Sequence, residues 1–213
     1  MKSKTRAFII TDVQNDFLPG GALAVPKGDE VIPVINHLSR HFSLVVATLD
    51  WHPPGHMSFA SSHPGKKPGE KVGSQILWPD HCVQHSRGAA LADALDDTAI
   101  SARFLKGSDP AHDSYSAFFD NQHKRSTGLG DYLKEKGVEE VVIAGLATDY
   151  CILYSVLDAL KLGFEVIVVK DGCRAINLKQ DDEKKAYAQM REKGARLMTS
   201  QELAKELPDR APY

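Results

Sequence analysis

The sequence contains few cysteines, and they are not spaced for a disulfide framework. Only three of the 213 residues are cysteine, namely Cys82, Cys151 and Cys173, and no two of them form a C-x-x-C pair. Proteins held together by disulfides usually carry an even number of cysteines at regular spacings. We therefore expect a cytoplasmic protein whose cysteines stay reduced.

Long hydrophobic runs and an excess of one charge are missing as well. The basic start of the chain is followed by an apolar run of only residues 7–10, too short for a signal peptide core or a membrane span. The 26 basic and 28 acidic residues give a net charge of −2. This balance gives no reason to expect nucleic acid or an anionic membrane as a partner. The absence of G-x-S-x-G, G-x-x-x-x-G-K and G-x-G-x-x-G counts against serine hydrolases of that class and against nucleotide enzymes.

Strand-like and helix-like segments alternate along most of the chain, and 42% of its residues are hydrophobic. Short β-branched or aliphatic runs predict strands buried on both faces. These runs are residues 7–10, 44–49, 141–144 and 164–169, with weaker candidates at 100–105 and 195–198. Helical patterns cover residues 30–42, 130–136, 149–162 and 181–193, and a glycine follows each of the last three. The alternation predicts one α/β domain over residues 1–213, with a mostly parallel sheet between helical layers.

A loop region at about residues 50–87 interrupts this alternation. The stretch 51–87 contains five prolines and five of the nine histidines. A long irregular segment in a compact domain is usually functional or disordered, and the apolar side chains here require burial, which favours a ligand-bearing loop. Asp50 and His52 lie two residues apart after a predicted strand, so their side chains point the same way. A carboxylate with imidazoles suits Zn, Mn or Fe; the alternative is a set of histidines scattered over the surface.

Three reactive side chains each follow a predicted strand. Asp12 is a candidate proton carrier, or otherwise a turn or cap aspartate. Lys106 is a candidate cation for orienting a carboxylate and ionising a thiol, or otherwise a solvated lysine. Cys151 is predicted in the first turn of a helix, where the positive helix end favours a thiolate nucleophile, although a free cysteine among apolar residues is commonly core filler. Parallel strands would bring all three to one edge of the sheet.

Five blocks in order resemble the nicotinamidases, within the isochorismatase-like hydrolase superfamily. The blocks are "DVQNDFLPGGAL", "DWHPPGHMSF", "WPDHCVQ", "KGSDPAHDSYSAF" and "GLATDYCI", and they cover most of the chain. The resemblance implies a three-layer α/β/α fold with a mostly parallel sheet of about six strands. It also implies hydrolysis of nicotinamide to nicotinate and ammonia in pyridine nucleotide salvage, and activity on pyrazinamide.

The resemblance also assigns roles to residues of this chain. It makes Cys151 the nucleophile and Asp12 and Lys106 its catalytic partners. It implies a cis peptide at Leu146–Ala147 and an oxyanion hole built from the N–H groups of Ala147 and Cys151. The implied divalent metal, with Zn favoured over Mn and Fe, is held by Asp50, His52, His81 and, as a variable fourth position, His56. The implied substrate pocket contains Phe17, Trp78 and Tyr115, with Leu23 and Tyr150 as plausible neighbours.

Other functions stay open at this point. A related cysteine amidohydrolase acting on another small amide or carbamoyl compound is the nearest alternative. An isochorismatase-type vinyl-ether hydrolase would leave Cys151 without a role. A non-catalytic metal-binding module predicts bound metal and an ordinary thiol, and a redox-sensing protein would require a resolving cysteine close by. The oligomeric state is not determined by the sequence.

Overall fold

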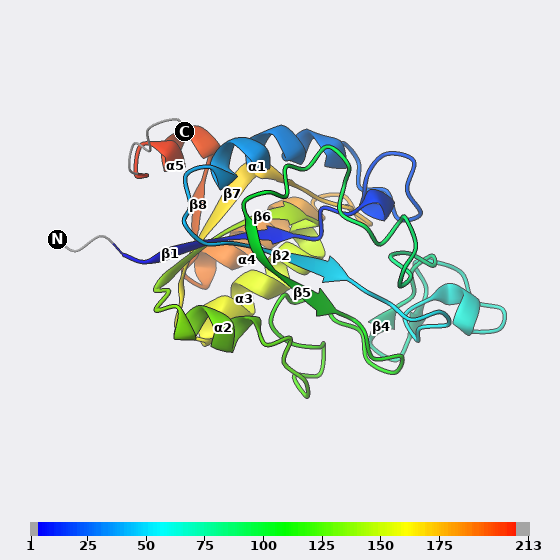
Figure 1. Ribbon diagram of the computed structural model, residues 1–213. Helices are drawn as coiled ribbons and strands as arrows, with labels where there is room; N and C mark the ends of the chain where they lie inside the picture. The colour runs from blue at the N-terminus through cyan, green and yellow to red at the C-terminus, as the bar shows by residue number, and fades with distance from the viewer. Residues whose placement is uncertain (1–3, 208–213) are drawn as a thin grey trace.

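The fold is built on a six-stranded, all-parallel sheet, seen in a computed structural model that describes residues 4–207 (Figure 1). The strand order is β5-β2-β1-β6-β7-β8. The strands are β1 (Arg6–Thr11), β2 (Val45–Asp50), β5 (Ile100–Lys106), β6 (Glu140–Leu146), β7 (Glu165–Arg174) and β8 (Arg196–Met198). All six predicted strands are confirmed. The apolar runs of β1, β2, β6 and β7 are buried between two helical layers, whereas the edge strands β5 and β8 are partly exposed.

Helices cover both faces of this sheet. In Figure 1, α1 and α5 lie on one face, and α2, α3 and α4 lie on the other. A hydrophobic core lies on each face of the sheet, and alternate residues of β1 point into one or the other. Phe8 and Ile10 pack with α1, whereas Ala7 and Ile9 pack with the opposite helical layer. The helices are α1 (Val31–Ser39), α2 (Leu129–Glu135), α3 (Leu153–Lys161), α4 (Asp182–Glu192) and α5 (Ser200–Ala204). The expected three-layer α/β/α architecture is confirmed.

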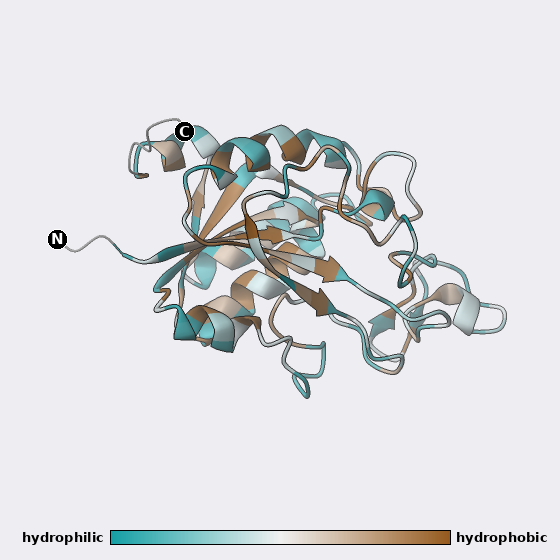
Figure 2. Ribbon diagram, viewed as in Figure 1, coloured by the Kyte–Doolittle hydropathy of each residue, from teal (hydrophilic) through white to brown (hydrophobic). Residues whose placement is uncertain are grey.

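Hydropathy follows these layers. Figure 2 shows hydrophobic residues concentrated in the strands, with hydrophilic residues along the outer sides of the helices.

Gly137, Gly163 and Gly194, which follow α2, α3 and α4, have positive φ, as expected for helix C-terminal caps. No helix in the described part of the chain is long and apolar enough to cross a membrane. The two ends of the domain predicted over residues 1–213 lie outside the described residues.

The segment before α3 differs from the sequence prediction. A helix was expected over residues 149–162, but a single wider turn, η4 (Thr148–Ile152), precedes α3. The carbonyl of Ala147 accepts hydrogen bonds from the N–H groups of Tyr150 and Ile152, both at 3.1 Å, and the second spans five residues. Cys151 therefore lies in a π-type turn and not in the first turn of the α-helix. The expected cis peptide at Leu146–Ala147 is present.

The loop region between β2 and β5 lies at the carboxyl end of the sheet (Figure 1). It contains only the short turn η3 (Ala60–Ser62) and the hairpin β3 (Lys71–Val72) and β4 (Gln75–Ile76). Several of its apolar side chains are nevertheless buried, namely Phe59, Leu77, Trp78 and Cys82, although Val72 in the hairpin is exposed. The region is thus a packed wall beside the strand ends that carry the candidate reactive residues.

Candidate active site

Asp12, Lys106 and Cys151 meet at the carboxyl edge of the sheet. They follow or end β1, β5 and β6, three parallel strands that place their last residues on the same side. The Lys106 ammonium lies 2.9 Å from Asp12 Oδ2 and 3.4 Å from Cys151 Sγ. It also contacts Asp50 Oδ1 and donates to the carbonyl of Ser114 at 3.0 Å. A single cation therefore links two carboxylates and the thiol.

All four side chains of this group are buried, and burial controls their charges. Burial by itself lowers the pKa of Lys106, but the charges of Asp12 and Asp50 raise it well above its ordinary value, so the lysine is cationic. Burial raises the pKa of Asp12 to about 6, against the opposing charge of Lys106. Burial also raises the pKa of the Cys151 thiol well above its ordinary value, although Lys106 opposes this. The resting side chain is thus a thiol, and the expected preference for thiolate is outweighed by desolvation.

Asp50, His52 and His81 form a second group beside the first. Their ligand atoms lie within 4.8 Å of one another. The Nδ1 atoms of His52 and His81 lie 2.9 Å from the Gly107 carbonyl and 2.8 Å from the Pro79 carbonyl. A neutral ring must carry its hydrogen on the nitrogen that faces a carbonyl, so each Nε2 keeps its lone pair. These Nε2 atoms lie 3.8 and 3.7 Å from Asp50 Oδ2.

The donor set of this second group fits a divalent metal ion. One carboxylate oxygen and two imidazole lone pairs converge, and carbonyl groups fix both rings from behind. Burial lowers the pKa of His52 to about 4, so its imidazole is neutral at pH 7 and available as a ligand. For Asp50, burial is outweighed by Lys106 and His52, which hold the pKa below its ordinary value and keep the carboxylate charged.

His56 takes a different orientation from these three residues. Its Nδ1 lies 2.8 Å from Ser58 Oγ, and its Nε2 lies 2.9 Å from the Asp109 carbonyl. The ring stacks on His52 with centroids 4.3 Å apart. Its ligand atom groups with His52 and Asp113, and not with Asp50 and His81.

A small cavity of about 20 Å³ adjoins both groups. The residues lining it are Phe17, Leu23, Asp50, Trp78, His81, Asp113, Tyr115, Ala147, Tyr150, Cys151 and Ile176. The expected pocket residues thus line one cavity with Cys151, and Asp50 and His81 line it too. The Trp78 indole donates to the Tyr115 hydroxyl at 3.1 Å, which fixes two of the aromatic walls. Phe17, Trp78, Tyr115 and Tyr150 give the cavity aromatic walls, which suit apolar and edge contacts with an aromatic ring.

A family comparison matches the chain over nearly its whole length. Residues 6–202 match the sequence model of the isochorismatase domain. The chain belongs to the isochorismatase family. It is similar to the nicotinamidase of Escherichia coli K12, with 48% identity over 201 residues that cover 91% of this chain and 94% of that protein.

Solved structures of isochorismatase-family enzymes share the fold. A nicotinamidase/pyrazinamidase of Acinetobacter baumanii matches with a TM-score of 0.91 and 42% identity, over 95% of this chain and 100% of that chain. A pyrazinamidase of Pyrococcus horikoshii, solved in complex with zinc, matches with a TM-score of 0.76 and 38% identity, over 92% of this chain and 99% of that chain.

Three residues that the sequence argument did not single out help to build this family site. The Thr48 hydroxyl donates to Asp12 Oδ1 at 2.7 Å. Gln14 donates to the Asp50 carbonyl and accepts from the Asp50 N–H, both at 2.8 Å, and so fixes the backbone of a candidate metal ligand. Asp113 lines the cavity. Sequence features could have identified all three residues. Gln14 and Asp113 lie within the quoted blocks, and Thr48 lies two residues before Asp50 on the same strand, so its side chain faces the same side.

Proposed function

We propose that this chain is a nicotinamidase that hydrolyses nicotinamide to nicotinate and ammonia through a cysteine nucleophile. The observation that carries the proposal is the position of Lys106, in contact with Asp12, Asp50 and Cys151 at once. This arrangement joins a nucleophile, a base and a candidate metal ligand around one aromatic cavity. The nicotinamidase of E. coli, similar over most of its length, supports the choice of substrate.

In the proposed reaction, Asp12 starts the chemistry as a general base. It takes the proton of the Cys151 thiol as Sγ forms its bond to the amide carbon, since the buried thiol is neutral beforehand. Lys106 stabilises the charge that moves between Sγ and Asp12. The carbonyl electrons shift to oxygen, and the N–H groups of Ala147 and Cys151 donate to that oxyanion.

Ammonia leaves in the second half of the first step. Asp12 returns its proton to the amide nitrogen as the carbon–nitrogen bond breaks, leaving a thioester on Cys151. Asp12 then takes a proton from water, whose oxygen adds to the thioester carbon. The carbon–sulfur bond breaks, the thiol regains its proton, and nicotinate is released.

The pocket residues bind and orient the ring. Phe17, Trp78 and Tyr115 would hold the flat pyridine by apolar and stacking contacts. A divalent metal held by Asp50, His52 and His81 would supply an electrophilic anchor for the ring nitrogen. We propose zinc as this metal, because the ligand set suits it and the Pyrococcus relative was solved with zinc. Pyrazinamide, with a ring nitrogen in the matching position, is expected as a second substrate.

The cellular role follows from this chemistry. A nicotinamidase would act in pyridine nucleotide salvage, and three free, buried cysteines agree with a cytoplasmic protein. The small molecule is the expected partner, and neither a nucleic acid nor a membrane is part of the proposal.

Ammonia release from nicotinamide tests this function directly. The metal-loaded protein is compared with Cys151→Ala, with a chelator-treated sample and with the matched control Cys173→Ala, a buried cysteine outside the cavity. We expect release from the parent and the control, loss of at least about a thousandfold in Cys151→Ala, and recovery of the chelated sample on metal addition. A Cys151→Ala protein with substantial turnover would exclude covalent catalysis. No release by the loaded parent would point to a sibling amidase.

A further inference from the structure

Two of the three groups of candidate metal ligands in the described residues share a histidine. Asp50, His52 and His81 make one, and His52, His56 and Asp113 make the other, each with ligand atoms within 4.8 Å of one another. His52 belongs to both sets. A metal bound by His52 would therefore have further candidate ligands in both groups. One of them, Asp113, lies in the segment after β5.

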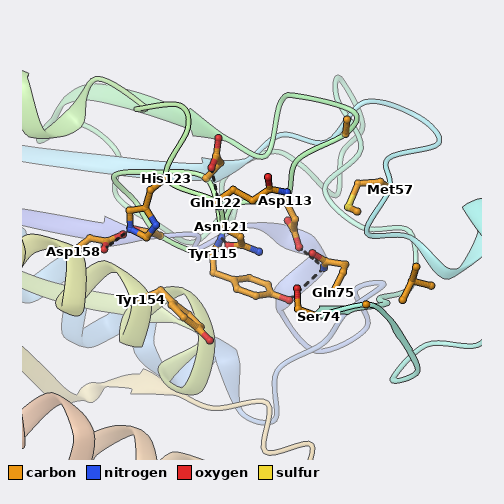
Figure 3. A pocket seen from close by; sticks show the side chains of 15 residues that line it. Met57, Ser74, Gln75, Asp113, Tyr115, Asn121, Gln122, His123, Tyr154 and Asp158 are labelled. Atoms are coloured by element: carbon orange, nitrogen blue, oxygen red, sulfur yellow. Dashed lines mark hydrogen bonds and ion pairs between the residues drawn. The ribbon is translucent and has the colours of Figure 1, made fainter.

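Asp113 lies in the wall between two cavities. It lines the small cavity together with Asp50, His81 and Cys151. It also lines a larger neighbouring cavity of about 460 Å³, outside the catalytic group. In Figure 3, Asp113 points toward Gln75, whose amide donates to Asp113 Oδ2 at 2.7 Å. The N–H of Ser114 donates to Oδ1 at 2.8 Å.

The surroundings of Asp113 leave its charge without a cation. The residue is only 5% exposed. Within residues 4–207 its side-chain oxygens accept from an amide and a backbone N–H, and it takes part in no ion pair with lysine or arginine. Burying a carboxylate is costly unless a cation or a metal compensates it. A divalent ion bound beside it would supply that compensation.

His56 and Asp113 belong to the same group, which contains His52 but neither Asp50 nor His81. His56 is the less available ligand of the two. Both of its ring nitrogens are engaged, by Ser58 and by the Asp109 carbonyl. Asp113, in contrast, has carboxylate lone pairs available beyond its two donors. Counted over the whole site, the three carboxylates of Asp12, Asp50 and Asp113 would be balanced by Lys106 and one divalent ion.

We propose that Asp113 is a second carboxylate of the metal site, joined to Asp50 and His81 through the shared ligand His52, and that it takes the role that the family resemblance gave to His56. The inference deepens the proposed function and rests on it, since both involve the same metal. Gln75, on the β3–β4 hairpin, becomes a positioning residue that holds this carboxylate toward the cavity. The hairpin is thereby coupled to metal binding.

Metal affinity, measured without substrate, tests the proposal. Metal-free parent protein, Asp113→Asn and His56→Gln are titrated with Zn²⁺ against a chromogenic chelator, and with Co²⁺ while the visible spectrum is recorded. The matched control is Asp120→Asn, which removes the same charge from a residue that lines the larger cavity but not the small one. Asp113→Glu keeps the charge, and circular dichroism confirms that each variant is folded.

We expect Asp113→Asn to weaken Zn²⁺ affinity by at least about 10- to 100-fold, the loss typical of an outer-shell partner, and to change the Co²⁺ spectrum. Asp113→Glu should recover part of the affinity, and His56→Gln and Asp120→Asn should bind as the parent does. The proposal is overturned by a parent-like Zn²⁺ affinity in Asp113→Asn, by an unchanged Co²⁺ spectrum, or by loss of metal in His56→Gln. Because no nicotinamide is used, failure of the proposed activity would leave these metal readouts interpretable.

Discussion

At the scale of single residues, the site depends on one buried cation. Lys106 is 2% exposed and contacts Asp12, Asp50 and Cys151. Without it, two carboxylates would be buried close together, which strongly disfavours ionisation of both. The lysine therefore allows Asp12 to act as a base with a pKa of about 6, close to the pH at which a base is most useful.

Thr48→Val should move the acidic limb of the pH profile to higher pH. Burial raises the pKa of Asp12 to about 6, while Lys106 and the Thr48 hydroxyl oppose the rise. The base is the charged form, so kcat/KM should increase with pH and level off above that value. Removing a donor to the charged form raises the pKa further. The test is kcat/KM for nicotinamide between about pH 5 and 8, with metal content checked at each pH.

Thr11→Val is the matched control for this experiment. The Thr11 hydroxyl is also buried on a neighbouring strand, but within the described residues it has no hydrogen-bond partner. Removal of this hydroxyl should leave the acidic limb of the kcat/KM profile at the same pH as in the parent. A Thr48→Val profile identical to the parent profile would argue that Asp12 is not the titrating base.

At the scale of elements, the site requires β1 and β6 to approach closely at their carboxyl ends. Thr11 pairs with Gly145 in the register of these strands. A Cβ atom at Gly145 would lie 2.0 Å from the Thr11 carbonyl oxygen, and Gly145 has φ +131°. Glycine is therefore required where β1 delivers Asp12 and β6 leads into the turn of Cys151.

Gly145→Ala should be strongly destabilising. Because the obstructing atom is backbone, the two strands must separate, and we expect the free energy of unfolding to fall by about 3 kcal/mol or more. The control Gly163→Ala has positive φ but nothing within 4 Å of the added Cβ, so it should cost only about 1–2 kcal/mol of backbone strain. Urea unfolding of both variants measures this difference, and equal losses would contradict the steric argument.

At the scale of the whole molecule, one end of the parallel sheet carries the candidate active site and the other end contributes to stability. The carboxyl ends carry the reactive groups, whereas the amino ends carry a network of charges. Glu140, at the start of β6, is 1% exposed and pairs with Arg6 on β1 and Arg196 on β8. Glu206, after α5, pairs with both arginines. The network joins three strands and the segment after α5, far from the cavity.

Glu140→Gln should lower stability and leave turnover intact. The substitution removes the buried charge, but Arg6 and Arg196 are 21% and 47% exposed and keep their pairs with Glu206, so we expect a loss of about 1–2 kcal/mol in the free energy of unfolding. The control is Glu165→Gln, whose pair with Lys4 is exposed on both sides and should contribute less than about 1 kcal/mol. Urea unfolding together with ammonia release checks both statements. A loss of activity in the folded Glu140 variant would contradict this separation of tasks.

The sequence by itself determined the layers and the edge at which the site forms. Buried strands need apolar runs, and parallel strands need helical crossovers, so hydrophobic periodicity along the chain was sufficient to predict them. The same local logic placed Asp12, Lys106 and Cys151 after strands, and therefore at one edge. Family resemblance added the substrate and the expected ligands, but could not orient their side chains.

Only the tertiary structure decided how those side chains meet. Thr48 reaches Asp12, and Gln75 reaches Asp113, across 36 and 38 residues of chain. Such hydrogen bonds depend on backbone paths through loops that have no periodic pattern. The orientation of His56 and the width of the turn at Cys151 were likewise set by contacts with neighbouring carbonyls. Local propensity acts over a few residues, whereas the charges and lone pairs of this site are balanced between segments that only folding brings together.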